Sequence, residues 1–168
     1  MAGTMGTPAS TTRLYSEQER LRRDRSRWTL VQGVLAPLQF LVFLVSLWLV
    51  VRYLHSGEGF AAATASVVVK TGVLYAIMVT GSLWEHDVFG RYLFAPAFFW
   101  EDVVSMAVLT LHSAYLAALV FDLLTPRALM LLALLAYASY VVNAAQFVVK
   151  LGMARREARG AAGTLEAV

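Results

Sequence analysis

The fold class of this chain is decided by residues 28–53, WTLVQGVLAPLQFLVFLVSLWLVVRY. A helix needs about 20 mostly apolar residues to cross a bilayer, and this stretch exceeds that length. Three more segments have the same character, at about 62–84, 103–124 and 128–151. They are too long and too weakly alternating for barrel strands, and helices satisfy their backbone hydrogen bonds locally. The sequence therefore predicts an all-α integral membrane protein, a bundle of four transmembrane helices.

The composition agrees with a membrane domain and excludes several classes of site. Of the 168 residues, 59% are hydrophobic, which is high for a soluble domain of this size. There is no cysteine, so disulfides, thiolate metal sites and a cysteine nucleophile are excluded. The net charge is only +3, and we expect no nucleic-acid partner.

Basic residues predict the orientation, because lysine and arginine concentrate in cytoplasmic loops. Most of the basic residues occur in three places: before the first span, in the middle loop, and at or after the end of the fourth span. They are Arg13, Arg20, Arg22, Arg23, Arg25, Arg27, Arg91, Lys150, Arg155, Arg156 and Arg159. Four spans place all of them on one face, so we expect both termini to be cytoplasmic. We divide the chain into a basic tail (1–26), a membrane domain (27–152) and a second tail (153–168), with disorder expected at 1–15 and 157–168.

Polar residues inside the spans fall on stripes, since helical positions seven or eleven apart nearly eclipse. The stripes are Gln32, Gln39 and Ser46; Thr71, Met78 and Glu85; Glu101, Ser105 and His112; and Ser139, Asn143, Gln146 and Lys150. If they converge, they form a polar cleft that opens to the cytoplasm and narrows toward His112. The alternative is that such residues only join helices through hydrogen bonds. We expect Lys70 to extend toward the outer interface.

The loop between the second and third spans carries the candidate chemistry. Residues 84–102 read WEHDVFGRYLFAPAFFWED, with four acidic residues at the edge of a membrane, where charge is costly. Glu85 and Glu101 adjoin tryptophans, and burial favours the neutral carboxyl group that a general acid needs. The aromatic residues of the loop either anchor it in the interface or form a surface on which a planar ligand stacks.

Several common sites are missing from the sequence. It has no P-loop, no glycine-rich dinucleotide turn and no Ser-His-Asp signature. It has no Glu-x-x-His motif for a di-iron centre, and its three histidines are not spaced as a metal cluster. We predict no metal site of the protein's own, and leave open an axial ligand to a metal inside a pigment.

Three stretches of the chain resemble the 3-vinyl (bacterio)chlorophyllide hydratases of bacteriochlorophyll synthesis. They are residues 27–50, residues 70–116 with the unusual segment LFAPAFFWED, and residues 140–151. The resemblance implies that water adds across the C3 vinyl group of chlorophyllide a or 3-vinyl bacteriochlorophyllide, giving the 3-(1-hydroxyethyl) product. It also implies that no cofactor is needed, the magnesium belonging to the pigment.

The residues then take candidate roles in an acid-catalysed hydration. The catalytic candidates are Glu101, Glu85, Asp102 and His112, with Glu101 or Glu85 as the acid and the other, or Asp102, stabilising the cation. His112, Asn143 or Gln146 would hold water or approach the magnesium. Lys150, Arg91 or Arg27 would pair with the propionate. Gln32, Phe98 and Trp100 complete the candidate pigment-binding set.

Partners and location follow from the same resemblance. We expect the pigment, the lipid bilayer and other enzymes of bacteriochlorophyll synthesis as partners, in the bacterial inner membrane, cytoplasmic or intracytoplasmic. Two alternatives stay open. One is a non-catalytic protein that binds pigment or assists assembly, and the other is a small transporter, against which the lack of inverted repeats argues.

Overall fold

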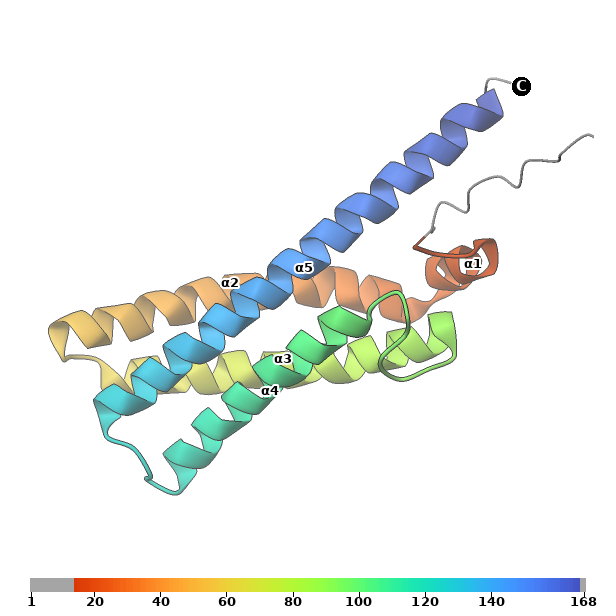
Figure 1. Ribbon diagram of the computed structural model, residues 1–168. Helices are drawn as coiled ribbons and strands as arrows, with labels where there is room; N and C mark the ends of the chain where they lie inside the picture. The colour runs from red at the N-terminus through yellow and green to blue at the C-terminus, as the bar shows by residue number, and fades with distance from the viewer. Residues whose placement is uncertain (1–13, 167–168) are drawn as a thin grey trace, which may run out of the picture.

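The computed structural model describes residues 14–166, with side chains as far as Arg156. Within that range the chain forms five α-helices and no strand (Figure 1). The helices are α1 (Glu17–Arg25), α2 (Arg27–Ser56), α3 (Phe60–Phe89), α4 (Phe99–Val120) and α5 (Pro126–Glu166). The last four are long and apolar enough to cross a membrane. The predicted all-α fold with four membrane-spanning helices is confirmed.

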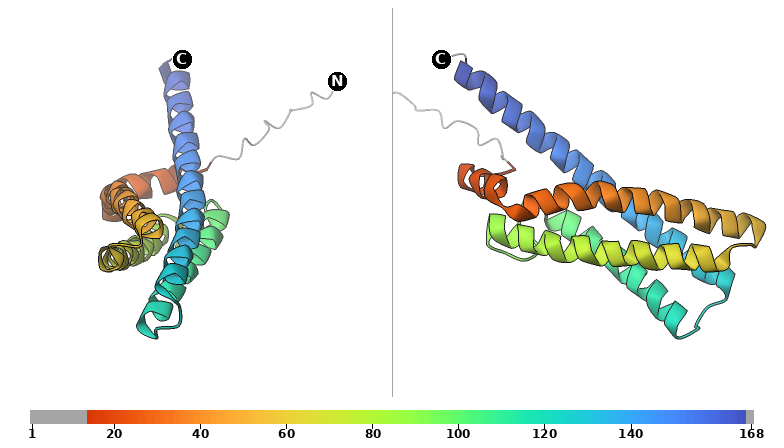
Figure 2. Two further views of the ribbon diagram at one scale, coloured as in Figure 1. Left: turned by 90° about the vertical axis from the view of Figure 1, so that its left-hand side faces the viewer. Right: turned by 180° about the vertical axis from the view of Figure 1, so that it is seen from behind.

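The four long helices form two hairpins. α2 packs along α3, and α4 packs along α5. The short α2–α3 turn contains Gly57 at φ +75°, a left-handed conformation that glycine adopts without steric cost. The two hairpins cross at an angle, with α5 also touching α2 (Figure 2). As a result the start of α2, the end of α3 and the start of α4 gather at one end, together with the α5 segment that leaves the bundle.

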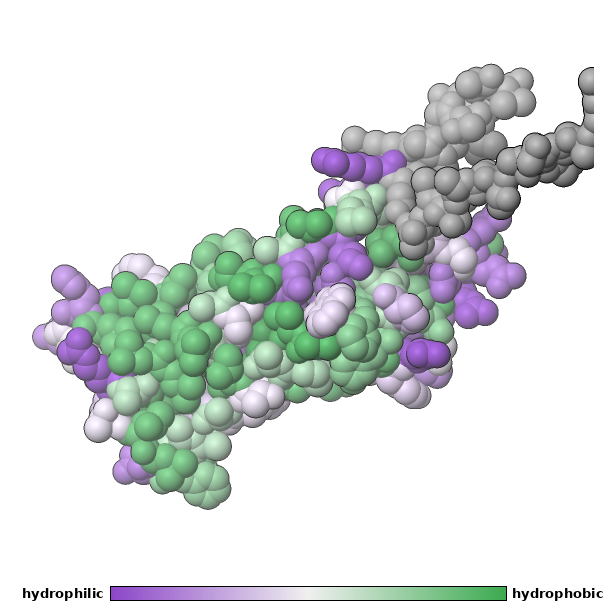
Figure 3. All heavy atoms as spheres, in the orientation of Figure 1, coloured by the Kyte–Doolittle hydropathy of each residue, from purple (hydrophilic) through white to green (hydrophobic). Residues whose placement is uncertain are grey.

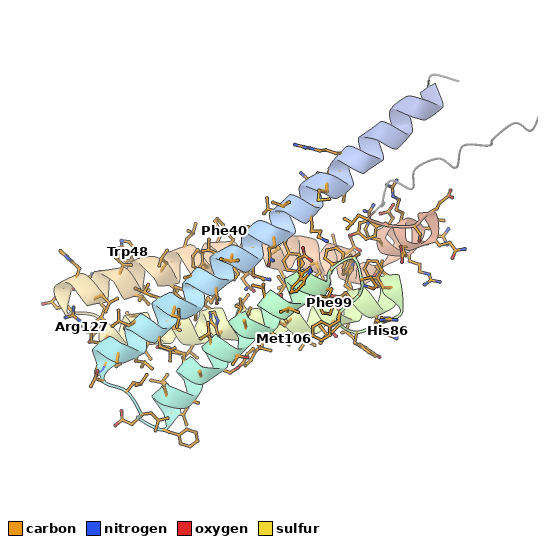
Figure 4. All side chains as sticks on the ribbon, viewed as in Figure 1. Phe40, Trp48, His86, Phe99, Met106 and Arg127 are labelled. Carbon is orange, nitrogen blue, oxygen red and sulfur yellow. The ribbon has the colours of Figure 1, made fainter. Side chains whose placement is uncertain are left out.

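The interior of the bundle is mostly apolar, with its centre at Phe43, Val67 and Tyr137. The outer surface is apolar as well: Phe40 and Trp48 project from the outer side of α2 (Figure 4). Most of the visible face is hydrophobic, interrupted by a hydrophilic group where α5 crosses the other helices (Figure 3). Apolar side chains on both faces suit a bundle surrounded by lipid.

A second apolar cluster closes the end of the bundle where α3 meets α4. Phe98 is only 5% exposed and lies edge-to-face against Trp84, with 5.5 Å between ring centroids. It also stacks on Phe147 of α5 at 6.2 Å. The connecting loop, residues 90–98, thus folds back into the bundle. Gly90 ends α3 at φ +74° and starts this return.

The helix ends differ in detail from the expected spans. α3 continues to Phe89, so Glu85 is helical, and the loop is shorter than the expected residues 85–102. α1 lies inside the basic tail and starts with a capping box, in which the Ser16 hydroxyl accepts from the Glu19 amide at 3.3 Å. α5 runs to Glu166 through a stretch rich in good helix formers, where disorder was expected from 157. The disorder expected at 1–13 and 167–168 lies outside the described residues.

Candidate active site

Three buried carboxyl groups lie at the end of the bundle that the loop closes. Glu85 comes from the last turns of α3, while Glu101 and Asp102 come from the first turn of α4. The loop backbone holds two of them. The Phe94 amide donates to Asp102 Oδ2 at 2.6 Å, and the Ala95 amide donates to Glu85 Oε2 at 3.3 Å. Phe94 has φ +59°, a conformation costing a non-glycine residue about 1–2 kcal/mol.

Glu85 and Asp102 form a carboxyl pair, because the adjacent amides of Ala95 and Phe94 in one loop hold their carboxyl groups. Two ionised carboxylates in one buried site repel each other, so the pair favours a state that keeps one proton. Both side chains are about 5% exposed or less, which shields the shared proton from bulk water. A carboxyl pair that keeps one proton in a buried site is a candidate general acid.

Glu101 is in a different environment, because it faces Lys150 of α5. The Lys150 ammonium lies 3.6 Å from Glu101 Oε1 and also donates a hydrogen bond to the backbone carbonyl of Ala97. The same ammonium sits 5.5 Å from the centre of the Phe98 ring. In this ion pair Glu101 is a carboxylate that can accept a proton. The site therefore contains a proton donor and a proton acceptor on adjacent residues of one helix turn.

Asn143 joins α5 to the start of α4. Its side-chain amide donates to the Glu101 carbonyl at 3.1 Å and to the Ser105 hydroxyl at 2.9 Å. Both amide protons are used by these two bonds. Asn143 therefore fixes the position of Glu101 and has no remaining donor for a substrate.

A shallow groove of about 500 Å³ runs along α5 beside this ion pair. Its polar lining comes from Glu101, Gln146 and Lys150. Its apolar lining is formed by Val141, Val142, Ala145 and Val149. The buried Gln146 Oε1 accepts no hydrogen bond from the part of the chain that the structure describes. The groove thus pairs an apolar wall with a small polar end at the carboxylate.

His112 lies eleven residues further along α4 than Glu101, a rise of about 16 Å. It is fully buried, and Lys70 of α3, also fully buried, approaches its Nε2 to 2.5 Å. Its Nδ1 lies 2.8 Å from the Val108 carbonyl oxygen. A carbonyl oxygen only accepts hydrogen bonds, so the nitrogen beside it must be the donor. Nδ1 therefore carries the proton, and Nε2 accepts from Lys70. With both nitrogens engaged, His112 has no free atom for a pigment magnesium.

The expectation that Lys70 extends toward the outer interface is wrong. Its amine points into the bundle, where the Tyr140 ring centre lies 4.2 Å away. Burial of an amine is costly in a membrane, and the imidazole and aromatic rings offset that cost here. The polar stripes therefore make two separate clusters: the carboxyl groups at the loop end and the Lys70–His112 pair deeper in. Lys70 is the buried polar residue that sequence reasoning misplaced.

The remaining candidate residues lie near the same end of the bundle, and their described contacts are with groups other than the three carboxyl groups. Gln32 donates to the Thr80 hydroxyl at 2.7 Å and serves the α2–α3 contact. Phe98 is packed in the apolar cluster, as described above. Trp100 is 68% exposed on the outer side of α4, and Arg91 is exposed in the loop. Figure 4 shows Phe99 at the start of α4, on the same end of the bundle as His86 at the end of α3.

Across residues 14–156, the His, Asp and Glu side chains form no group of three that could hold a metal ion. The acidic cluster is instead made of one proton-sharing pair and one ion-paired carboxylate. Such a set is suited to moving a proton to and from a substrate.

Comparison with known proteins gives a consistent picture. A family model described as 2-vinyl bacteriochlorophyllide hydratase matches residues 15–153. A protein of that name from Cereibacter sphaeroides is 62% identical over 150 residues, covering 89% of this chain and 92% of the relative. Another, from Rhodobacter capsulatus, is 61% identical over 153 residues, covering 90% and 89%. No solved structure matches the chain.

Proposed function

Since the chain belongs to the 2-vinyl bacteriochlorophyllide hydratase family, we propose that it is a hydro-lyase acting on a chlorophyllide. It adds water to the ring vinyl group, placed at C2 or C3 by the two numbering systems for the macrocycle, and gives a 1-hydroxyethyl group. The observation that carries this proposal is a buried carboxyl pair next to an ion-paired carboxylate. Hydration changes no oxidation state overall, so the reaction needs no redox cofactor.

The Glu85–Asp102 pair supplies the proton. It protonates the terminal carbon of the vinyl group, leaving a cation on the carbon attached to the ring. The macrocycle delocalises that charge, and the Glu101 carboxylate stabilises it electrostatically. This assignment favours the carboxyl pair over Glu101 as the acid, because Glu101 faces an ammonium, whereas Glu85 and Asp102 share one buried site.

The pigment lies against α5 in this proposal. The valine-lined side of the groove offers an apolar surface to the macrocycle, and its polar end brings the vinyl group near the carboxyl groups. Lys150 has three N–H donors, of which one is used by the Ala97 carbonyl, so its ammonium can pair with both Glu101 and the propionate. The groove faces the surroundings of the bundle, so the pigment enters sideways from the membrane.

The multi-pass fold places this reaction in a membrane, and we propose the bacterial inner membrane, cytoplasmic or intracytoplasmic. The loop end carries the basic residues Arg27, Arg91 and Lys150, which supports the proposal that it is the cytoplasmic side. Other enzymes of bacteriochlorophyll synthesis are expected partners, because an apolar pigment passes between them most readily within the membrane.

The test is turnover by the purified chain incubated with chlorophyllide a. We expect a product heavier by one water, with a blue-shifted red absorption band because the vinyl conjugation is lost. Glu101→Gln should abolish hydration while pigment still binds. Unchanged pigment that co-purifies with the wild-type protein would contradict the proposal, and full activity in Glu101→Gln would remove Glu101 from the mechanism.

A further inference from the structure

We propose that Gln146 holds the water molecule that is added to the vinyl group, together with the Glu101 carboxylate. This inference rests on the proposed hydration and deepens it. The reaction needs a water whose lone pair faces the cationic carbon. Both hydrogens of such a water must then point to acceptors, so its binding site consists of acceptor atoms rather than donors.

The polar end of the α5 groove provides two acceptors of that kind. The Glu101 carboxylate faces it, held by Lys150 at 3.6 Å. The other acceptor belongs to Gln146, a lining residue of the groove one turn before Lys150 on the same helix. Apart from Lys150, the rest of the lining is valine and alanine, which offer a water no hydrogen bond. A water here has one orientation that satisfies it.

The Gln146 oxygen itself indicates that a donor is needed. It is shielded by the protein yet accepts no hydrogen bond from the described residues. An unsatisfied buried acceptor costs about 1–3 kcal/mol, a cost that a bound water removes. The last torsion of a glutamine side chain is broad, so rotation about it can turn the oxygen toward the groove that this side chain lines.

The structure also eliminates the two other residues with the right chemistry. His112 has both ring nitrogens engaged and lies about 16 Å along α4 from Glu101. Asn143 is held against the start of α4 and does not line the groove, so its amide oxygen is not placed to accept from this water. Gln146 is the uncharged polar side chain that lines the groove beside the carboxylate.

The step balances without a further reactant. The carboxyl pair gives its proton to the terminal vinyl carbon, forming a methyl group and a cation on the adjacent carbon. The water oxygen bonds to that cationic carbon and one water proton passes to Glu101. Glu101 then releases that proton to solvent, and the Glu85–Asp102 pair regains one from it.

The experiment compares two variants whose side chains match glutamine in length. Gln146→Met removes the acceptor atom, and Gln146→Glu keeps an acceptor. The purified full-length proteins are incubated with chlorophyllide a in D₂O, and mass spectrometry follows both product and remaining substrate. We expect hydration by Gln146→Met to fall about tenfold to a hundredfold, the effect of losing one hydrogen bond to the water. In this variant the cation formed from the pigment should instead lose a proton and return to substrate. That return leaves deuterium in the vinyl group of the remaining substrate.

Gln146→Glu should keep hydration and show little deuterium in the remaining substrate. Ser139→Ala, whose hydroxyl bonds only to its own helix at Ala136, serves as the matched control on α5. The inference would be overturned if Gln146→Met hydrated the substrate at the wild-type rate and gave a product with the wild-type stereochemistry. A parallel loss of hydration and deuterium uptake would also overturn it, because Gln146 would then act before the cation forms. If the proposed function itself fails, the wild-type protein forms no product.

Discussion

Removal of His112 tests the buried Lys70–His112 pair directly. The change His112→Leu deletes an acceptor 2.5 Å from the Lys70 amine and a donor 2.8 Å from the Val108 carbonyl. Lys70 is fully buried, so its amine is left without its hydrogen-bond partner. The expected loss in the free energy of unfolding is about 1–3 kcal/mol. At about 2–4 °C per kcal/mol for a chain of this size, Tm falls by about 2–12 °C.

The assay is thermal unfolding of the purified protein in detergent, followed by far-UV circular dichroism. Lys70→Met removes the polar amine itself, so the double variant with His112→Leu should unfold at a higher temperature than His112→Leu alone. The coupling energy of the cycle should be about 0.5–3 kcal/mol. The control is Tyr75→Phe, which breaks a 2.7 Å bond to Ser113 between the same two helices at an exposed position and should cost about 0.6 kcal/mol. Additive effects of the two single changes would refute the pairing.

Three further changes separate packing from chemistry. Phe98→Ala should destabilise the protein by about 3–5 kcal/mol, seen as a lowered Tm, because the ring is buried in the aromatic cluster. Trp100→Ala should change stability by no more than about 0.5 kcal/mol, since the ring is 68% exposed; a larger loss would indicate a partner for that ring. Lys150→Met should raise KM for chlorophyllide and lower kcat, because both the propionate and Glu101 lose their cation; unchanged kinetics would remove Lys150 from the site.

The membrane fold and the inward faces of its helices could be predicted from the sequence. Long apolar runs are a local signal, and 3.6-residue periodicity placed Gln39 and Ser46 on one face of α2, where both are buried. The same reasoning aligned Glu101 with His112, and the structure buries both. The apolar length of a span and the residues that share one face of a helix depend only on spacing along the chain. Both can therefore be derived from the sequence.

Contacts between helices could not be predicted in the same way. The pairing of Glu85 with Asp102 depends on how far α3 continues and how the loop returns, including the left-handed Phe94. The Lys70–His112 bond depends on the rotation of α3 against α4. From the sequence alone, a lysine in a membrane helix is equally compatible with a position at the membrane interface. Gln146 was a candidate from its stripe, but its unsatisfied oxygen is visible only in three dimensions.

The most direct test of the central claim, that the Glu85–Asp102 pair donates the proton, is hydration by the double variant Glu85→Gln, Asp102→Asn at saturating chlorophyllide a. The two changes keep the shapes of the side chains and remove both carboxyl groups, so neither residue can donate an acidic proton. A general acid contributes about 10²- to 10⁴-fold, so kcat should fall by at least about a hundredfold while pigment binding is retained. A kcat within about threefold of the wild-type value would contradict the account, because that loss falls far short of what a general acid contributes.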